Sequence, residues 1–328
     1  MLYRRLGRSG LKLSALSFGS WVTFGSQVDQ PASVDLMACA FDHGINFFDN
    51  AEAYAYGESE RLMGRALRKL GWSRDRFCVS SKVFFGCVPD PAPTQCGLSR
   101  KHLVEASHQS LERLGLDYLD LFFCHRPDPD TPVEEIVVTM ATLIQQGKIL
   151  YWGTSEWPAT LIGEAIRKAR ELGLPGPLME QPQYNLFVRK RVETEYEPLC
   201  RIEGLGLTTW SPLASGILTG KYRDTSKAPP GSRLSLPGYE WLRERLSGET
   251  GRKQLDAAHR LVDLGHEEGA APSVLAIAWC LTNPQVTTVI LGASRKEQLL
   301  DNLKAIELFP RLSGPVKDRL ESLYPDPA

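Results

Sequence analysis

The chain has 328 residues, and its 38 lysines and arginines are balanced by 39 aspartates and glutamates, giving a formal net charge of -1. This balance argues against binding of nucleic acid or anionic membranes, and no apolar run approaches the roughly 20 residues that span a bilayer or resembles a secretory signal. The seven cysteines are odd in number and form no Cys-x-x-Cys, which argues against a disulfide scaffold or a tetrahedral zinc site. We therefore expect reduced thiols in a cytoplasmic protein.

Short apolar segments recur along the chain and predict strands. Residues 2–14 are expected to form a β-hairpin that turns at Arg8-Ser9-Gly10. The later runs are brief, are rich in β-branched and aromatic residues and mostly lack strict alternation, which is typical of strands buried on both faces. The predicted strands are, in chain order, Leu13–Phe18, Asn46–Asp49, Phe77–Lys82, Tyr118–Cys124, Ile149–Thr154, Leu178–Gln181, Leu207–Trp210 and Thr287–Leu291.

Segments of helical period separate these strands. Thr131–Glu134 predicts a capping box with its proline at the first helical position. The helices predicted at His102–Leu114 and Ala159–Leu172 are each expected to end just before a glycine. Repeated strand–helix units favour a (β/α)8 TIM barrel, with residues 1–328 as a single domain. An open, doubly wound sheet is the structural alternative.

Two long loops follow predicted strands. Val83–Gly97 comes after the third strand and Gly220–Gly251 after the seventh. Loops of this length in a compact domain are functional or disordered, and loops after barrel strands lie on the catalytic face. We therefore expect both loops to border the active site.

Four ionisable side chains lie at or just after the ends of successive predicted strands. Asp49 ends the second strand, Tyr54 lies in the loop that follows, Lys82 ends the third strand and His125 ends the fourth. Because the C-terminal ends of barrel strands converge on one mouth, these side chains are expected to meet there.

These residue types suit carbonyl reduction, in which a hydride leaves an alkoxide that needs a proton. Tyr54 can supply that proton, although its ordinary pKa is ~10. The Lys82 ammonium is expected to lower this pKa, and Asp49 to hold Lys82 in place. His125 can hydrogen-bond the carbonyl oxygen, which is general acid catalysis with electrostatic support.

Each residue taken alone also has an ordinary structural interpretation. Asp49 can cap a helix, Lys82 can be a solvated charge, His125 can be a satisfied structural residue and Tyr54 can pack against a loop. Their joint placement at strand ends favours catalysis. Cys124, beside His125, is better explained as a small buried residue than as a nucleophile.

The segment FDNAEAYAYGESE, residues 48–60, resembles the signature of the aldo-keto reductases. The resemblance continues in order through Lys82, His125 and the segments 153–155, 181–185 and 210–213. Segments 19–27, 211–222, 238–242 and 291–302 are most similar to the branch of potassium-channel β subunits and their bacterial relatives.

This resemblance implies an NADP(H)-linked oxidoreductase in a (β/α)8 barrel, with Asp49, Tyr54, Lys82 and His125 as its catalytic tetrad. The channel subunits generally have asparagine where this chain has His125. The histidine is the residue of the ordinary reductases of the superfamily, so catalysis is favoured over pure sensing.

The expected cofactor is NADPH. No Gly-x-Gly-x-x-Gly opens a βαβ unit, and barrels bind phosphates in the loops after strands seven and eight. The resemblance implies that Lys221 and Arg233 contact the phosphates, that Ser294 and Gln298 surround the 2′-phosphate, and that Trp210 stacks on the nicotinamide. The full cofactor set that we predict is Ser20, Trp21, Gln27, Asp49, Ser155, Gln181, Trp210, Ser211, Pro212, Leu213, Ser215, Lys221, Arg233, Gly292, Ser294, Gln298 and Asn302.

Three further residues belong to this prediction. Ser155 and Gln181 match positions that bond the carboxamide, and Glu156 is assigned to the same contact although it departs from the Asn or Arg common there. Arg295 is expected to add charge near the 2′-phosphate. Such cations favour NADPH over NADH.

The substrate pocket is predicted to be aromatic. Its expected lining is Trp21, Tyr54, Phe84, Phe85 and His125, with Trp157 as a further candidate. This lining suits aldehydes and ketones with apolar or aromatic groups, while Arg126 leaves an acidic substrate open. Trp21 is equally compatible with ordinary core packing.

Two other functions compete with the reductase. One is a channel β-subunit-like module that binds NADPH and reports redox state with slow turnover. The other is a metal-dependent lyase or aldolase, which ranks last because the predicted mouth lacks a cluster of histidines and carboxylates, so no metal is expected. The resembled branch forms tetramers or larger rings, which implies a homo-oligomer.

Overall fold

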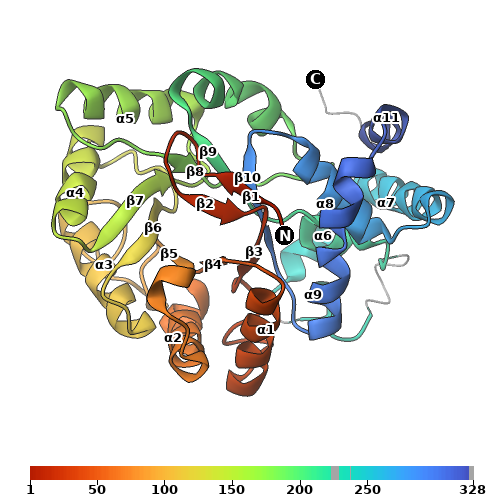
Figure 1. The fold of residues 1–328 in the computed structure, drawn as a ribbon, viewed down its shortest axis with the longest axis horizontal. Helices are drawn as coiled ribbons and strands as arrows, with labels where there is room; N and C mark the ends of the chain where they lie inside the picture. The colour runs from red at the N-terminus through yellow and green to blue at the C-terminus, as the bar shows by residue number, and fades with distance from the viewer. Residues whose placement is uncertain (223–228, 237, 325–328) are drawn as a thin grey trace.

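The computed structural model describes residues 1–222, 229–236 and 238–324. Its centre is a closed barrel of eight parallel strands, surrounded by helices (Figure 1). The strands are β3 (Leu16–Gly19), β4 (Phe47–Asp49), β5 (Cys78–Val83), β6 (Leu119–Cys124), β7 (Ile149–Thr154), β8 (Met179–Glu180), β9 (Gly206–Thr209) and β10 (Val286–Leu291). The barrel closes where β10 pairs with β3, which confirms the predicted (β/α)8 fold over the open sheet.

The helices follow the strands in alternation. They are α1 (Gln30–Asp42), α2 (Glu58–Leu70), α3 (Arg100–Leu114), α4 (Val133–Gln145), α5 (Ala159–Glu171), α6 (Glu240–Ser247), α7 (Glu249–Glu268), α8 (Pro272–Thr282), α9 (Lys296–Leu303), α10 (Ala305–Leu308) and α11 (Gly314–Ser322). Between β8 and β9, two turns of π-helix, Arg191–Glu195 and Leu199–Glu203, take the place of a regular helix. None of the helices in the described ranges is long and apolar enough to cross a membrane.

The predicted N-terminal hairpin is present as β1 (Tyr3–Arg5) and β2 (Lys12–Ser14). It crosses one end of the barrel (Figure 1), where Leu6 and Leu13 pack with Phe47 and Cys78, the first residues of β4 and β5, and with Leu121 of β6. The hairpin therefore closes the N-terminal end of the barrel and leaves the opposite end for chemistry.

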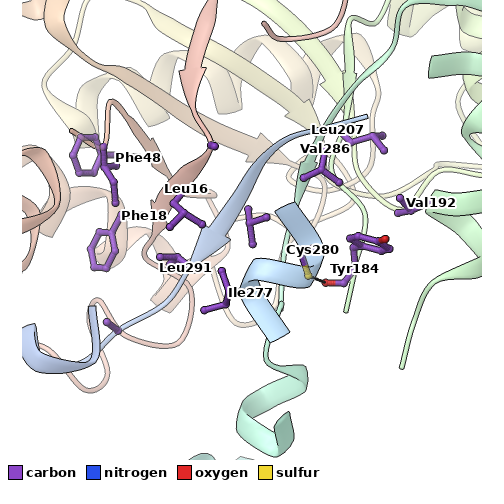
Figure 2. Packing of buried hydrophobic residues seen from close by; sticks show 14 of the residues in the cluster. Leu16, Phe18, Phe48, Tyr184, Val192, Leu207, Ile277, Cys280, Val286 and Leu291 are labelled. Carbon is purple, nitrogen blue, oxygen red and sulfur yellow. Dashed lines mark hydrogen bonds between the residues drawn. The ribbon is translucent and has the colours of Figure 1, made fainter. Parts of the chain in front are cut away.

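The strands are buried on both faces. Inward residues such as Phe47, Leu121 and Met179 form a small cluster inside the barrel. Outward residues pack against the helices in a much larger cluster, and Figure 2 shows the part of it where Ile277 and Cys280 of α8 face strand β10. This double burial explains why the strands lack strict alternation in sequence.

Three boundary predictions are wrong. The predicted strand Leu13–Phe18 is divided at Ala15, whose N–H bonds Leu2 in the hairpin while its carbonyl accepts from Val289 of β10. The expected capping box is absent, because Pro132 itself is the extended N-cap of α4 and Thr131 donates to Asp128 instead.

The predicted loop Gly220–Gly251 is also corrected. It contains a 3-10 turn at Arg233–Ser235, helix α6 and the start of α7, and residues 223–228 and 237 of the prediction lie outside the described residues. By contrast α3 ends at Leu114, as predicted, and Gly115 after it is left-handed.

Candidate active site

Strand alternation places three of the predicted catalytic side chains inside the barrel. Asp49 lies two residues after inward-facing Phe47, and Lys82 lies four residues after inward-facing Cys78. His125 follows inward-facing Phe123 by the same spacing of two. Since side chains two apart in a strand share a face, all three point into the C-terminal end of the barrel.

The Lys82 ammonium is the centre of this group. It donates to the Asp49 carboxylate at 2.7 Å, to the Asn50 carbonyl at 2.8 Å and to the Tyr54 hydroxyl at 3.1 Å. Lys82 is fully buried, so its charge depends on these partners. The contact between Lys82 and Tyr54 that the sequence predicts is therefore made.

Asp49 is held from its other side. Its second carboxylate oxygen accepts from the Ser80 hydroxyl at 2.7 Å and from the Gln181 amide at 3.0 Å. With Lys82, three donors fix one buried carboxylate: Ser80 and Lys82 of β5, and Gln181 at the end of β8. The Asp49 carboxylate thus bonds Lys82, Ser80 and Gln181, side chains of barrel strands and strand ends, rather than the N–H groups of a helix.

A tight turn after β4 presents Tyr54. The 3-10 turn Tyr54–Gly57 includes Ala55 and Tyr56 in the left-handed region, at φ 47° and 51°. Such backbone is uncommon for residues other than glycine and is held here by surrounding structure. The Tyr54 ring lies 5.9 Å from the His125 ring, centroid to centroid, so the two groups border the same space.

Burial keeps His125 neutral. Removal from water, followed by the charges of Lys82 and Arg126, lowers the pKa of His125 well below its ordinary value. Its buried Nδ1 has no hydrogen-bond partner among the described residues. Since His125 lines the cavity, its neutral imidazole can hydrogen-bond a ligand oxygen there without adding charge.

The predicted direction for Tyr54 is wrong. Burial, together with the negative charge of Asp49, raises the pKa of Tyr54 well above its ordinary value, while Arg126 lowers it by less. The sequence argument considered the Lys82 ammonium alone. In the structure Asp49 offsets that charge, and desolvation disfavours the phenolate.

A cavity of about 640 Å³ opens at this end of the barrel. It brings together sixteen of the seventeen predicted cofactor residues, Ser20 being the exception, and four of the five predicted substrate residues, Phe84 being the exception. Ser20 is fully buried and donates to the Asp49 carbonyl at 3.0 Å. Phe84 packs against the core while its neighbour Phe85 borders the cavity, and Trp157 is likewise buried away from it.

One end of the cavity gathers cations. Burial and the charges of Arg233 and Arg295 lower the pKa of Lys221, although its side chain as a whole is exposed. Its ammonium lies against Gly216, where an added Cβ would be only 2.9 Å away. No carboxylate forms a salt bridge with any of these three cations in the described part of the chain, and Lys221 and Arg233 line the cavity, so this end fits a multivalent anion.

The segment between β10 and α9 forms the adjoining wall. Gly292, Ser294, Gln298 and Asn302 all line the cavity, as predicted, but Arg295 does not. The Gln298 side chain accepts from the Ser294 N–H at 3.1 Å and fixes the entry to the helix. Asp301 lines this wall too and pairs with Lys304 at 2.7 Å.

Glu156 does not reach the cavity, which corrects its assignment to the carboxamide contact. Its carboxylate accepts from the Trp210 indole at 3.0 Å and from the Gln183 N–H at 2.6 Å, and pairs with Arg191 at 2.7 Å. Its backbone is left-handed, at φ 59°. Glu156 thus orients Trp210, whose ring borders the cavity.

Several cavity residues escaped the sequence argument. Val22, Thr23 and Ser26 come from the turn after β3, Gly216 and Thr219 from the segment after β9, and Tyr239 from the start of α6. All six lie inside the segments 19–27, 211–222 and 238–242 that carry the family resemblance, but none was assigned to the cofactor or the substrate.

The structure also describes the surroundings of the cysteines and the grouping of metal-ligating residue types. All seven cysteines are free, and burial raises the pKa of Cys124 far above its ordinary value, as its structural interpretation requires. The described residues contain no group of three histidines, cysteines or carboxylates that could hold a metal.

Comparison with known proteins agrees with this geometry. A model of the Aldo/keto reductase family matches residues 15–324. The chain is 48% identical over 98% of its length to a probable voltage-gated potassium channel subunit beta of Arabidopsis thaliana, and 49% identical to one of Oryza sativa subsp. japonica, covering 96% of each. It is 46% identical to a putative subunit of that name from Schizosaccharomyces pombe, over 98% of this chain and 92% of the relative. The chain therefore belongs to the aldo/keto reductase family.

Proposed function

We propose that this protein reduces aldehydes and ketones to alcohols with NADPH, using Tyr54 as the general acid. The observation that carries the proposal is the buried Lys82 ammonium, 2.7 Å from Asp49 and 3.1 Å from the Tyr54 hydroxyl. These two hydrogen bonds link the buried ion pair to the Tyr54 hydroxyl on the cavity wall. Such a relay supports proton donation to a bound oxygen.

The cavity walls support the cofactor assignment. Lys221 and Arg233 would hold the phosphates, and Trp210 would lie flat against the nicotinamide. The Gln181 amide N–H is already donated to Asp49, which leaves its carbonyl oxygen to accept from the carboxamide. When bound, the reduced nicotinamide supplies the hydride that the substrate carbonyl carbon receives.

Tyr54 and His125 then complete the reaction. As the carbonyl bond opens, its electron pair moves to oxygen and the Tyr54 proton is transferred to that oxygen. The Lys82 ammonium stabilises the phenolate left behind, and solvent restores the proton. Because the pKa of Tyr54 is raised, the phenol is protonated beforehand, while neutral His125 directs the carbonyl oxygen by a hydrogen bond. The balance is one carbonyl compound, one proton and one NADPH giving one alcohol and one NADP⁺.

The first test is the loss of NADPH absorbance with 4-nitrobenzaldehyde. Tyr54→Phe is expected to lower the rate at least ~100-fold, the usual contribution of a general acid. Tyr56→Phe is the matched control, since that side chain lies in the same turn but is exposed. Equal rates in the parent and Tyr54→Phe would refute Tyr54 as the proton donor.

The cation cluster at Lys221, Arg233 and Arg295 supports NADPH over NADH, because the additional 2′-phosphate brings negative charge toward it. We expect catalytic efficiency to be at least ~10-fold higher with NADPH, the effect of one charge-assisted hydrogen bond. Equal efficiency with both cofactors would contradict this.

A regulatory module that binds NADPH and reports redox state is the second candidate. The names of the relatives, which are channel subunits, favour it. It requires very slow turnover on aldehydes and slow release of cofactor, which stopped-flow mixing would measure. The presence of His125 beside Tyr54 and Lys82 favours turnover instead.

A further inference from the structure

Arg126 is a cation at the reactive end of the cavity that the proposed reduction does not use. It follows His125 directly after β6 and lines the cavity while half-buried. One guanidinium nitrogen, Nη1, donates to the His125 carbonyl at 2.5 Å and approaches the Ser155 hydroxyl at 3.5 Å. The side chain is thus anchored at one corner.

The opposite edge of this guanidinium remains free. Its Nε–H and Nη2 groups have no hydrogen-bond partner among the described residues, and no carboxylate there lies within salt-bridge distance. These two nitrogens share the edge that binds a carboxylate with two parallel hydrogen bonds. Because Arg126 lines the cavity, an anion bound in the cavity can approach this guanidinium.

The guanidinium lies close to the reacting groups. Its charge lowers the pKa of Tyr54 and of His125, and it lies 5.7 Å from the centroid of the Phe85 ring. That ring in turn lies 5.1 Å from the His125 ring, which makes one continuous wall. A group bound by Arg126 would therefore lie beside a carbonyl oxygen held by Tyr54 and His125.

Among the described residues that line the cavity, the carboxylates are Asp49 and Asp301, and each is paired with a lysine. The Asp49 carboxylate is paired with Lys82, so this ion pair adds no net charge. Lys221 and Arg233 belong to the segment after β9, whereas Arg126 follows β6, although the Arg233 guanidinium reaches to 5.3 Å from the centroid of the Trp21 ring, which itself lies 6.4 Å from the Tyr54 ring. Arg126 therefore adds a positive charge beside His125, on a different strand end from the cations assigned to the cofactor.

We propose that Arg126 binds a carboxylate of the substrate, so that the preferred substrates are carbonyl compounds with a carboxylate close to the carbonyl group. This inference rests on the proposed reductase function and names its substrate class. The reaction is unchanged: hydride adds to the carbonyl carbon, the oxygen takes the Tyr54 proton, and the carboxylate stays intact.

The test compares 2-carboxybenzaldehyde with its neutral methyl ester, methyl 2-formylbenzoate. The ratio of the two kcat/KM values cancels any effect on the hydride and proton transfers that both substrates share. In the parent we expect the acid to be favoured. In Arg126→Gln the ratio should fall about 10- to 100-fold, mainly through the KM of the acid, as loss of a charge-assisted hydrogen bond predicts. In Arg126→Lys the ratio should lie between those of the parent and of Arg126→Gln, because lysine keeps the positive charge but cannot make the two parallel hydrogen bonds of a guanidinium.

Arg167→Gln is the matched control, since it removes one positive charge from an exposed helical site and should leave the ratio unchanged. Benzoate binding to the NADPH-loaded protein, followed by tryptophan fluorescence, is a second readout that needs no turnover. Benzoate should bind the parent more tightly than benzamide does, and Arg126→Gln should remove the difference. An unchanged ratio, or equal binding of benzoate to parent and variant, would overturn the proposal. If neither aldehyde nor 4-nitrobenzaldehyde is reduced while benzoate still depends on Arg126, the proposed reductase function fails and the carboxylate site stands.

Discussion

The ion pair of Lys82 and Asp49 makes a stability prediction that can be worked out from the structure. The Lys82 side chain is 0% exposed and that of Asp49 is 4% exposed, with 2.7 Å between the charged atoms. Asp49→Asn keeps the shape but removes the countercharge and turns an amide donor toward the ammonium. Removing one partner of a buried pair costs about 3–5 kcal/mol, because the other charge is left uncompensated.

Lys82→Met removes the other charge at similar length and should cost about the same. The double variant leaves no buried charge, so its cost should be smaller than the sum of the two single costs by about 2–3 kcal/mol, in the range that coupled neighbours show. Urea unfolding at pH 7, followed by the fluorescence of the seven tryptophans, would measure all four proteins. If the cost of the double variant equalled the sum of the two single costs within ~0.5 kcal/mol, the reasoning would be refuted, because such additivity is typical of sites that do not interact.

Two further predictions concern glutamates near the cavity. Glu156→Ala removes the acceptor that lies 3.0 Å from the Trp210 indole nitrogen, so the Kd for NADPH in a fluorescence titration should rise about 5- to 10-fold with kcat little changed, since a hydrogen bond contributes ~1 kcal/mol. Glu195→Gln is the control, because Glu195 pairs with Arg191, the same arginine that pairs with Glu156, but does not accept the Trp210 indole N–H. An unchanged Kd in Glu156→Ala would exclude the positioning role. Burial raises the pKa of Glu180 from 4.5 to about 8, so between these pH values the folded protein keeps a proton that the unfolded chain has lost. The free energy of unfolding should therefore fall as pH rises from 5 to 8, by at most roughly 5 kcal/mol from this group. Thermal melting across that pH range should show this fall in the parent and a smaller fall in Glu180→Gln. The same pH dependence in both proteins would disprove the prediction.

Much of the architecture follows from local sequence patterns. Short, doubly apolar runs separated by helical segments predict the parallel barrel, and seven of the eight predicted strands overlap observed strands almost end to end. The strand that was misplaced is the one at Ala15, where the backbone switches from the hairpin to the barrel. Nothing in the side chains of this segment marks the switch, because apolar residues suit both partners.

For the site, the chain alone indicated that Asp49, Tyr54, Lys82 and His125 follow strand ends, since strand ends of a parallel barrel share one mouth. Tertiary structure decided what each group experiences there. The raised pKa of Tyr54 depends on burial and on a carboxylate held by Ser80 and Gln181, contributions that come from distant parts of the chain. The contact of Glu156 with the indole rather than with the cavity, and the free edge of Arg126, were likewise set by packing. The positions of residues at strand ends determine which of them can meet at the mouth of the barrel. Their desolvation and the directions of their side chains depend on packing against residues from the whole fold, which local sequence patterns do not show.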